Sequence, residues 1–195
     1  MVEALDRLLR SKLRAQTAPV VLALDGRSGV GKSTLAAYLA QRFDTQLVEG
    51  DDFFQGGPQM RSESAEELSN LCIDWRRLHD ALSSLRAGQV HLFNPFDWNA
   101  FDGSLCQQAR ELQPRPLIIH EGVYAGRTEL RDVTDIRVLL VADDAIRDER
   151  LRQREGEIGD WERQWQSAEA WYFEHKALAS SFDMVINSAD LAFEQ

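Results

Sequence analysis

The sequence predicts an α/β fold in which a five-stranded, mostly parallel sheet lies between two layers of helices. Five apolar runs do not alternate with polar residues, which is typical of strands buried on both faces. Segments with helical periodicity separate these runs, and a glycine-rich loop directly follows the first of them. Alternation of strands and helices indicates parallel strands with helices on both faces of the sheet.

The elements follow in order along the chain. An amphipathic helix is expected over 3–16, and Pro19 can precede the first strand, 20–25, without breaking a ladder of hydrogen bonds. The other expected strands are 46–54, 116–122, 136–143 and 183–190. The other expected helices are 32–43, 74–86, 143–155 and 160–176.

Composition limits the classes of function. The 195 residues, 44% of them hydrophobic, suit one compact domain over 1–195. A formal net charge of -10 argues against a general nucleic-acid binder and against binding to an anionic membrane, although a small anion needs only a local positive site. No apolar run approaches the roughly 20 residues of a membrane helix, and the start is unlike a signal peptide, so we expect a cytoplasmic protein. Cys72 and Cys106 suggest neither a disulfide framework nor a zinc site.

The glycine-rich loop, GRSGVGKS at 26–33, matches G-x-x-x-x-G-K-[ST] at every fixed position, between a strand and a helix. Its glycines let successive N–H groups point at phosphate oxygens, and the next helix adds positive charge at its N-terminus. Lys32 can reach the β- and γ-phosphates, Ser33 can hold Mg²⁺, and Thr34 adds a donor. The expected nucleotide-binding residues are Gly26, Arg27, Ser28, Gly29, Val30, Gly31, Lys32, Ser33 and Thr34.

Acidic residues follow two of the expected strands. Asp51 and Asp52 end the second strand, and Glu121 ends the third. Ligands of open parallel sheets bind outside the carboxyl ends of the strands, so these carboxylates are expected to border the γ-phosphate. A kinase needs a carboxylate to accept the proton of the attacking hydroxyl, and acids or water to complete the Mg²⁺ shell. Asp51 suits the first role, with Asp52 as the alternative base, and Glu121 suits the second; solvated turn acids or helix caps are the competing interpretation.

Three segments resemble the uridine kinase and phosphoribulokinase branch of P-loop kinases: DGRSGVGKST at 25–34, EGDDFF at 49–54 and IIHEGVYAG at 118–126. The resemblance implies a P-loop NTPase-type three-layer α/β/α fold, with Asp51 as catalytic base and a magnesium role for Glu121. The implied activity is an ATP- and Mg²⁺-dependent phosphotransferase with an alcohol group as acceptor, which moves the γ-phosphate to a hydroxyl of a small molecule.

A further segment, FNPFDWNAFDG at 93–103, resembles the uridine kinase hairpin in which a YDF triplet precedes a His and an Arg near the nucleoside. The FDW triplet matches in character, but Phe101 holds the His position and Gly103 the Arg position. A stacking or apolar pocket is retained, whereas the hydrogen-bonding partner of a base is not. A uridine- or cytidine-like nucleoside is the favoured acceptor; the alternatives are a sugar, a vitamin precursor, an antibiotic or a nucleoside monophosphate.

Acceptor binding is expected from the long irregular segments near 53–72 and 88–115. Asp74 is either the N-cap of a helix or a contact to an acceptor hydroxyl, and Asp97 either orients a hydroxyl or is a turn acid beside packed aromatics. Arg127 can also reach the acceptor. The expected substrate-binding residues are Asp52, Phe53, Asp74, Phe96, Asp97, Trp98 and Arg127.

The segment near 143–158 is expected to be the lid. Arg147, Arg150 and Arg154 follow at i, i+3 and i+7 and share one helical face. Guanidinium groups stabilise charge on transferring phosphoryl oxygens, so these arginines are expected to act in catalysis with Lys32 and Asp51. The alternative is ion pairing with interleaved acids on a solvated helix.

The expected helix 160–176 carries an apolar stripe that includes Trp161 and Trp165 and either packs on the sheet or covers the site. Glu162, Glu169 and His175 on the same helix can face the site.

A GTPase-type regulatory nucleotide binder is the competing class. It requires an N-K-x-D guanine motif, whereas NSAD at 187–190 lacks the lysine, and no D-x-x-G follows the third strand. The expected ligands are therefore ATP, Mg²⁺ and a small-molecule acceptor, without nucleic acid or membrane, and a homo-oligomer is left open.

Overall fold

The computed structural model describes residues 1–57, 59–156 and 159–191. Its central feature is a five-stranded sheet in the order β2-β5-β1-β6-β7, and every neighbouring pair of strands is parallel. The strands are β1 (Val20–Asp25), β2 (Thr45–Glu49), β5 (Leu117–Glu121), β6 (Ile136–Val141) and β7 (Met184–Asn187). The expected five-stranded parallel sheet is confirmed.

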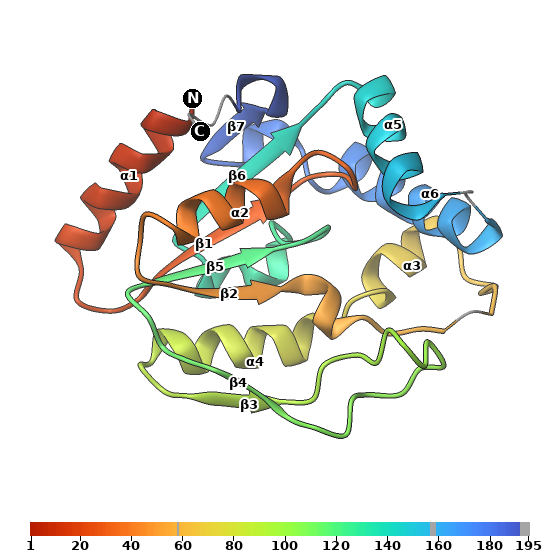
Figure 1. The fold of residues 1–195 in the computed structure, drawn as a ribbon, viewed down its shortest axis with the longest axis horizontal. Coiled ribbons are helices and arrows are strands. Elements are labelled where there is room, and N and C mark those ends of the chain that lie inside the picture. The colour runs from red at the N-terminus through yellow and green to blue at the C-terminus, as the bar shows by residue number, and fades with distance from the viewer. Residues whose placement is uncertain (58, 157–158, 192–195) are drawn as a thin grey trace.

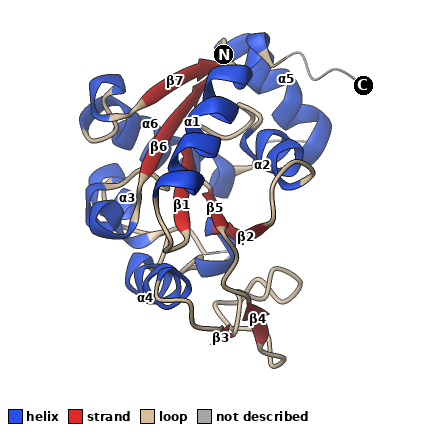
Figure 2. Ribbon diagram, turned by 90° about the vertical axis from the view of Figure 1, so that its left-hand side faces the viewer, coloured by secondary structure: helices blue, strands red, loops and turns tan. Residues whose placement is uncertain are grey.

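Helices cover both faces of this sheet (Figures 1 and 2). One face packs against α1 (Val2–Ala15) and α2 (Lys32–Ala40), and the other packs against α3 (Ala65–Leu71), α4 (Trp75–Arg86) and α6 (Asp160–His175). The three-layer α/β/α architecture is thereby confirmed. None of the helices in the described ranges is both long and apolar enough to cross a membrane.

The middle strand shows why the apolar runs do not alternate with polar residues. All six residues of β1 are buried. Val20, Leu22 and Leu24 pack in the core beneath α1 and α2, whereas Val21 packs in the core on the opposite face. A strand whose two faces both contact helices has no solvent-facing position for a polar side chain.

The second strand is shorter than the expected 46–54. It ends at Glu49, and Gly50–Phe53 form a 3₁₀ helix, η1, so both aspartates lie on a turn beyond the strand. Gly50 lies close to β5, since a Cβ at Gly50 would be 3.3 Å from the carbonyl oxygen of Glu121. The missing side chain lets the ends of β2 and β5 approach closely, which brings their acidic residues to one edge of the sheet.

A helix and a two-stranded hairpin lie within the segments expected to be irregular. Helix α3 begins with a capping box in which Ser64 and Glu67 bond each other's backbone N–H groups. Strands β3 (His91–Phe93) and β4 (Arg110–Leu112) form an antiparallel hairpin that lies apart from the main sheet (Figure 2). The remaining helix, α5 (Asp144–Glu155), occupies most of the expected lid, of which residues 157 and 158 lie outside the described residues.

Candidate nucleotide and acceptor site

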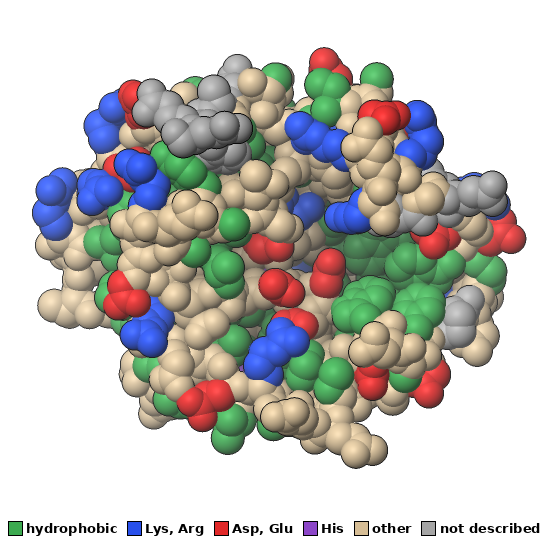
Figure 3. All heavy atoms as spheres, in the orientation of Figure 1, with side chains coloured by type: hydrophobic (Ala, Val, Ile, Leu, Met, Phe, Trp, Pro, Cys, Tyr) green, Lys and Arg blue, Asp and Glu red, His purple; other side chains and the backbone are tan. Residues whose placement is uncertain are grey.

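A cavity of about 540 Å³ opens where the glycine-rich loop, η1 and the end of β5 meet. In the space-filling view, the face seen in Figure 1 is hollowed to the right of centre, and acidic side chains there lie beside a large apolar patch (Figure 3). Residues of α5 and α6 complete the wall. The cavity therefore joins the glycine-rich loop to an apolar surface.

The loop between β1 and α2 adopts a backbone conformation that requires glycine at several positions. Gly29 and Gly31 have φ values of +81° and +97°, in the left-handed region that favours glycine. A Cβ at Gly26 would lie 2.4 Å from the carbonyl oxygen of Leu140, so this position excludes any larger residue.

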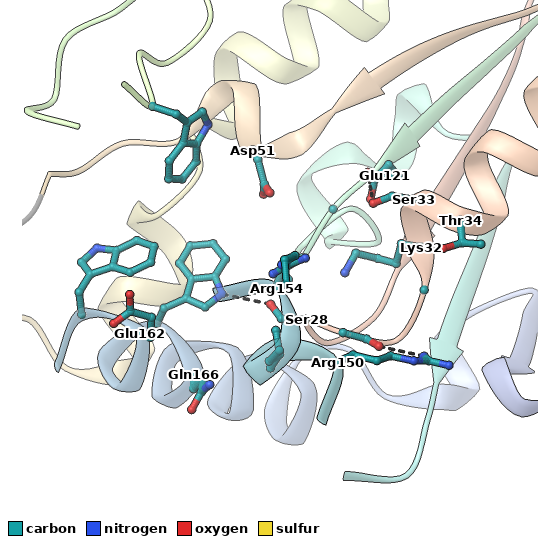
Figure 4. Close-up of a pocket in the computed structure, with 18 residues that line it drawn as sticks. Ser28, Lys32, Ser33, Thr34, Asp51, Glu121, Arg150, Arg154, Glu162 and Gln166 are labelled. Atoms are coloured by element: carbon teal, nitrogen blue, oxygen red, sulfur yellow. Dashed lines mark hydrogen bonds between the residues drawn. The ribbon is translucent and has the colours of Figure 1, made fainter. Parts of the chain in front are cut away.

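Lys32 begins α2 and points along the loop rather than out to solvent (Figure 4). Its side chain is buried, and Nζ donates to the carbonyl oxygens of Gly26 at 2.9 Å and Arg27 at 3.2 Å. The ammonium group is thus fixed in the wall of the cavity, where a phosphate bound by the loop would meet it.

Ser33 and Glu121 meet beside Lys32. The Ser33 hydroxyl donates to Oε1 of Glu121 at 2.9 Å. Burial raises the pKa of Glu121, although the nearby Lys32 and the Ser33 hydrogen bond oppose the shift. Hydroxyl and carboxylate oxygens are ligands that Mg²⁺ prefers, so this pair fits the expected metal role. Among the described residues, no three His, Cys, Asp or Glu side chains are grouped to hold a metal ion.

The adjacent aspartates of η1 occupy different environments. Asp51 is exposed and lines the cavity with Lys32 and Glu121 (Figure 4). Asp52 is buried and forms an ion pair with Arg110 of β4. Burial raises the pKa of Asp52 to about 6, with Arg110 opposing the shift. Asp52 therefore joins η1 to the hairpin and does not line the cavity, whereas Asp51 does.

Helix α5 brings two of its three predicted arginines to the cavity. Arg150 and Arg154 line it, and Nη1 of Arg150 donates to the carbonyl oxygen of Gly29 at 3.0 Å. Arg147 is 5% exposed and does not line the cavity. Its Nε donates to the carbonyl oxygen of Ser28 at 3.0 Å, so it holds the loop from behind, in place of the expected direct role in catalysis.

Glu169 of α6, which the sequence offered as a residue that can face the site, does not line the cavity but contacts the glycine-rich loop from behind. It is fully buried, and its Oε2 accepts hydrogen bonds from the Ser28 N–H at 2.9 Å and the Ser28 hydroxyl at 2.7 Å. Its Oε1 pairs with Arg147 at 3.2 Å. The sequence signal for a buried role of Glu169 is its position one helical turn after Trp165, within an otherwise apolar stripe.

Asp25, the last residue of β1, organises the start of the loop. Its carboxylate accepts the N–H groups of Gly26 at 2.8 Å, Tyr124 at 3.0 Å and Gly126 at 2.8 Å, and the Tyr172 hydroxyl at 2.8 Å. Burial raises the pKa of Asp25. Tyr124 has a φ of +75°, an uncommon value for a bulky residue, and its N–H bond to Asp25 helps hold this strained backbone.

The far end of the cavity is aromatic. Trp98, Trp161 and Trp165 line it, and Phe54 and Phe101 pack against them; these five residues are called the aromatic wall below. The ring centroids of Phe54 and Trp98 are 5.1 Å apart, and those of Phe101 and Trp161 are 5.2 Å apart. The apolar pocket expected from the segment 93–103 is present, and α6 supplies two of its tryptophans.

Two predicted acceptor residues are used in local structure. Asp74 is the N-cap of α4, where its carboxylate accepts the Arg77 N–H at 3.2 Å. Asp97 accepts the N–H groups of Asn99 at 3.0 Å and Ala100 at 3.1 Å, as a turn acid does. The N-cap and turn alternatives describe these residues, and neither lines the cavity.

Three other predicted acceptor residues are buried outside the cavity. Phe53 stacks on Phe93 with ring centroids 4.9 Å apart. Phe96 packs beneath Trp98, at 4.8 Å between centroids. Arg127 pairs with Glu129 at 3.1 Å. Of the predicted acceptor residues, Trp98 lines the cavity. The side chains of the others cap a helix, close a turn, pack in the core or form ion pairs.

Comparisons with known proteins show that the chain is similar to kinases. No protein-family model matches the chain. A uridine kinase of Latilactobacillus sakei subsp. sakei (strain 23K) is 28% identical over 138 residues, which cover 67% of this chain and 64% of that one. The chain is similar to the uridine kinases. It spans less than two thirds of the length of this curated relative.

Solved structures share the uridine kinase-like fold. A possible uridine kinase from Bacillus stearothermophilus has a TM-score of 0.69 and 23% identity, with 93% of this chain and 96% of that chain covered. D-glycerate 3-kinase from Cryptococcus neoformans var. grubii has a TM-score of 0.63 and 14% identity, with 97% and 96% covered. The expected uridine kinase-like resemblance and the P-loop kinase fold are thereby confirmed.

Proposed function

We propose that this protein is an ATP- and Mg²⁺-dependent phosphotransferase that moves the γ-phosphate to a hydroxyl of a small molecule. The observation that carries the proposal is that Asp51 lines the same cavity as Lys32, Ser33 and Glu121. A phosphate loop alone fits many nucleotide-binding classes, whereas a carboxylate across the cavity supplies the base that a kinase needs. The likeness to a curated uridine kinase supports the same class of reaction.

The donor site is assigned to the loop and α5. Backbone N–H groups of the loop and the Lys32 ammonium bind the phosphates of ATP, and Arg150 and Arg154 face the charge that spreads over the transferring group. Ser33 and Glu121 would hold Mg²⁺, which when bound neutralises phosphate charge.

The transfer step is assigned to Asp51. Its carboxylate accepts the proton of the acceptor hydroxyl as that oxygen forms a bond to the γ-phosphorus. The bond from the γ-phosphorus to the bridging oxygen breaks, and ADP leaves with that oxygen. Figure 4 shows the Asp51 side chain directed into the space that Lys32 and Arg154 border.

The favoured acceptor is a uridine- or cytidine-like nucleoside. The aromatic wall offers flat apolar surfaces on which a base can stack. The described cationic residues that line the cavity are Lys32, Arg150 and Arg154, and they belong to the loop and α5 rather than to the acceptor side. This distribution favours a neutral acceptor over a nucleoside monophosphate. Sugars, vitamin precursors and antibiotics are the alternatives.

A product assay tests the proposal. The full chain is incubated with ATP, Mg²⁺ and panels of nucleosides, nucleoside monophosphates and sugars, and mass spectrometry detects any acceptor that gains a phosphoryl group. We expect phosphorylation of at least one neutral hydroxyl compound that carries a flat ring. ATP binding without any phosphorylated product would contradict the proposal, and a clear preference for guanine nucleotides would favour a regulatory nucleotide binder.

A further inference from the structure

Ser28, the third residue of the glycine-rich loop, directs its polar groups at residues outside the loop. Its N–H and hydroxyl donate to Oε2 of Glu169 at 2.9 and 2.7 Å, and its carbonyl oxygen accepts from Nε of Arg147 at 3.0 Å. Nε1 of Trp165 donates to the Ser28 hydroxyl oxygen at 3.4 Å. One residue of the loop thus contacts both α5 and α6.

The Glu169 carboxylate that bonds Ser28 is buried and paired with a buried arginine. Glu169 is fully buried and Arg147 is 5% exposed, and the two pair at 3.2 Å between Nη2 and Oε1. A buried charge is tolerated when it is both paired and hydrogen-bonded, and removal of one partner is strongly unfavourable. Glu169 therefore fixes Ser28 relative to α6, since a Ser28 that moved alone would leave part of this carboxylate without donors.

Trp165 connects the same residue to the acceptor side. Its ring lines the cavity and packs against Phe54 and Trp161, at 5.9 and 6.2 Å between ring centroids. Glu169 lies one turn further along α6, and a helix moves its successive turns together. A displacement at Ser28 therefore reaches the aromatic wall through the indole N–H and through the helix.

We infer that Ser28 and Glu169 are positioning residues that make the aromatic wall respond to nucleotide binding. Bound phosphate competes with the carbonyl oxygens of Gly26 and Arg27 for the Lys32 ammonium and takes up loop N–H groups. A change in the loop conformation is transmitted through Ser28, because its hydrogen bonds to Glu169 and Arg147 make it move together with α5 and α6. The inference rests on the proposed function to the extent that the loop binds a nucleotide.

Tryptophan fluorescence during a titration with ADP and Mg²⁺ tests this coupling, while calorimetry measures ADP affinity separately. The full chain is compared with Trp165→Phe, Ser28→Ala and Trp171→Phe. Trp171 is the matched control because it lies on the same helix and stacks on His175, outside the cavity. We expect ADP to change the wild-type emission, Trp165→Phe to lose most of that change and Trp171→Phe to retain it.

The Ser28→Ala variant separates coupling from direct contact. Calorimetry measures its ADP affinity, and its emission change is compared with that of the wild type at ADP concentrations that saturate each protein. Its emission change is expected to fall by at least about half, and Ser28→Thr, which keeps the hydroxyl, is expected to restore it. Circular dichroism checks folding, and Ser28→Gly replaces Ser28→Ala in the titration where alanine prevents folding.

The outcomes distinguish the coupling from the proposed function. A full emission change in a folded Ser28→Ala or Ser28→Gly protein means that the nucleotide affects the indole directly, which overturns the coupling. An emission change that Trp165→Phe retains overturns it as well. Calorimetry that shows no ADP binding to the wild type overturns the proposed function together with the coupling.

Discussion

The Ser33 hydroxyl donates to the Glu121 carboxylate over 2.9 Å, so the end of the glycine-rich loop and the end of β5 meet at one point. Register explains the meeting, because Leu24 of β1 pairs with Glu121 of β5 immediately before the chain enters the loop. The two residues supply a hydroxyl and a carboxylate within the cavity that Asp51 also lines.

Glu121→Gln is expected to weaken the use of Mg²⁺. The amide keeps a partner for Ser33 but loses the negative charge that a divalent cation requires, so the Mg²⁺ concentration for half-maximal phosphotransfer should rise on the order of tenfold. Glu49→Gln is the matched control, because Glu49 ends the neighbouring strand opposite Glu121 but does not line the cavity. An unchanged Mg²⁺ requirement in Glu121→Gln would remove this residue from the metal site.

Asp51→Asn is expected to lower kcat by about 10²- to 10⁴-fold, because the amide cannot accept the proton of the acceptor hydroxyl. Calorimetry should show ATP affinity close to the wild-type value. Asp52→Asn, the adjacent control, should keep most of its kcat, since Asp52 pairs with Arg110 outside the cavity. The assignment of the base is wrong if Asp51→Asn retains transfer while Asp52→Asn loses it.

Trp161→Ala is expected to raise the KM of the acceptor by about 10- to 100-fold, because a stacked base loses roughly 1–3 kcal/mol when its aromatic partner is removed. The KM of ATP should change much less, which separates the acceptor side from the donor side. Trp171→Ala controls for the loss of a tryptophan from α6. Equal KM values for the acceptor in both variants would place the acceptor elsewhere.

Tyr172→Phe and Tyr124→Phe form a matched pair for stability. The Tyr172 hydroxyl donates to Asp25, and its removal is expected to lower the free energy of unfolding by about 2 kcal/mol, the range for a hydrogen bond to a charged group. The Tyr124 hydroxyl is buried without a hydrogen-bond partner among the described residues, so Tyr124→Phe should be neutral or stabilising. Urea unfolding of both variants measures the difference, and equal losses would contradict this account of Asp25.

Asp52 is expected to make stability depend on pH. Its pKa is about 6 in the folded protein and 3.8 as the ordinary value, so the folded state binds more protons between these limits. Stability from this group is therefore present below about pH 4 and is lost as pH rises through 6, by up to about 3 kcal/mol. The difference in unfolding free energy between wild type and Asp52→Asn, measured from pH 4 to 7, should follow this decline. A difference that stays constant with pH would show that Asp52 ionises normally.

The fold was predictable because its signals are local. The apolar run of β1, the glycine positions and Lys32 lie within 13 residues, and their order alone indicates a strand, a phosphate loop and a helix. The hairpin was harder to predict because β3 and β4 have three residues each, too few for a periodic pattern to stand out.

Site residues were predictable where a local motif identifies them. They were not predictable where a residue distant in sequence determines the contacts of a side chain. Ser33 was proposed from the loop motif, and Asp51 and Glu121 were proposed from strand ends. Arg147 has the same spacing signal as Arg150, yet Glu169, 22 residues away, takes its guanidinium group. Glu169 in turn meets Ser28 across 141 residues of sequence. No local pattern gives the partner of a buried charge, because tertiary packing selects it.

Lys32 serves the loop in two capacities. An ammonium group has three N–H donors, and two of them are given to the Gly26 and Arg27 carbonyl oxygens at the start of the same loop. The residue proposed to bind the phosphate therefore also stabilises the conformation of the loop. Substitution of Lys32 by a neutral residue would remove the positive charge and also the two hydrogen bonds that stabilise the loop. A loss of nucleotide affinity in such a variant would therefore measure the sum of both effects. The group proposed to bind the ligand also supports the wall of the cavity.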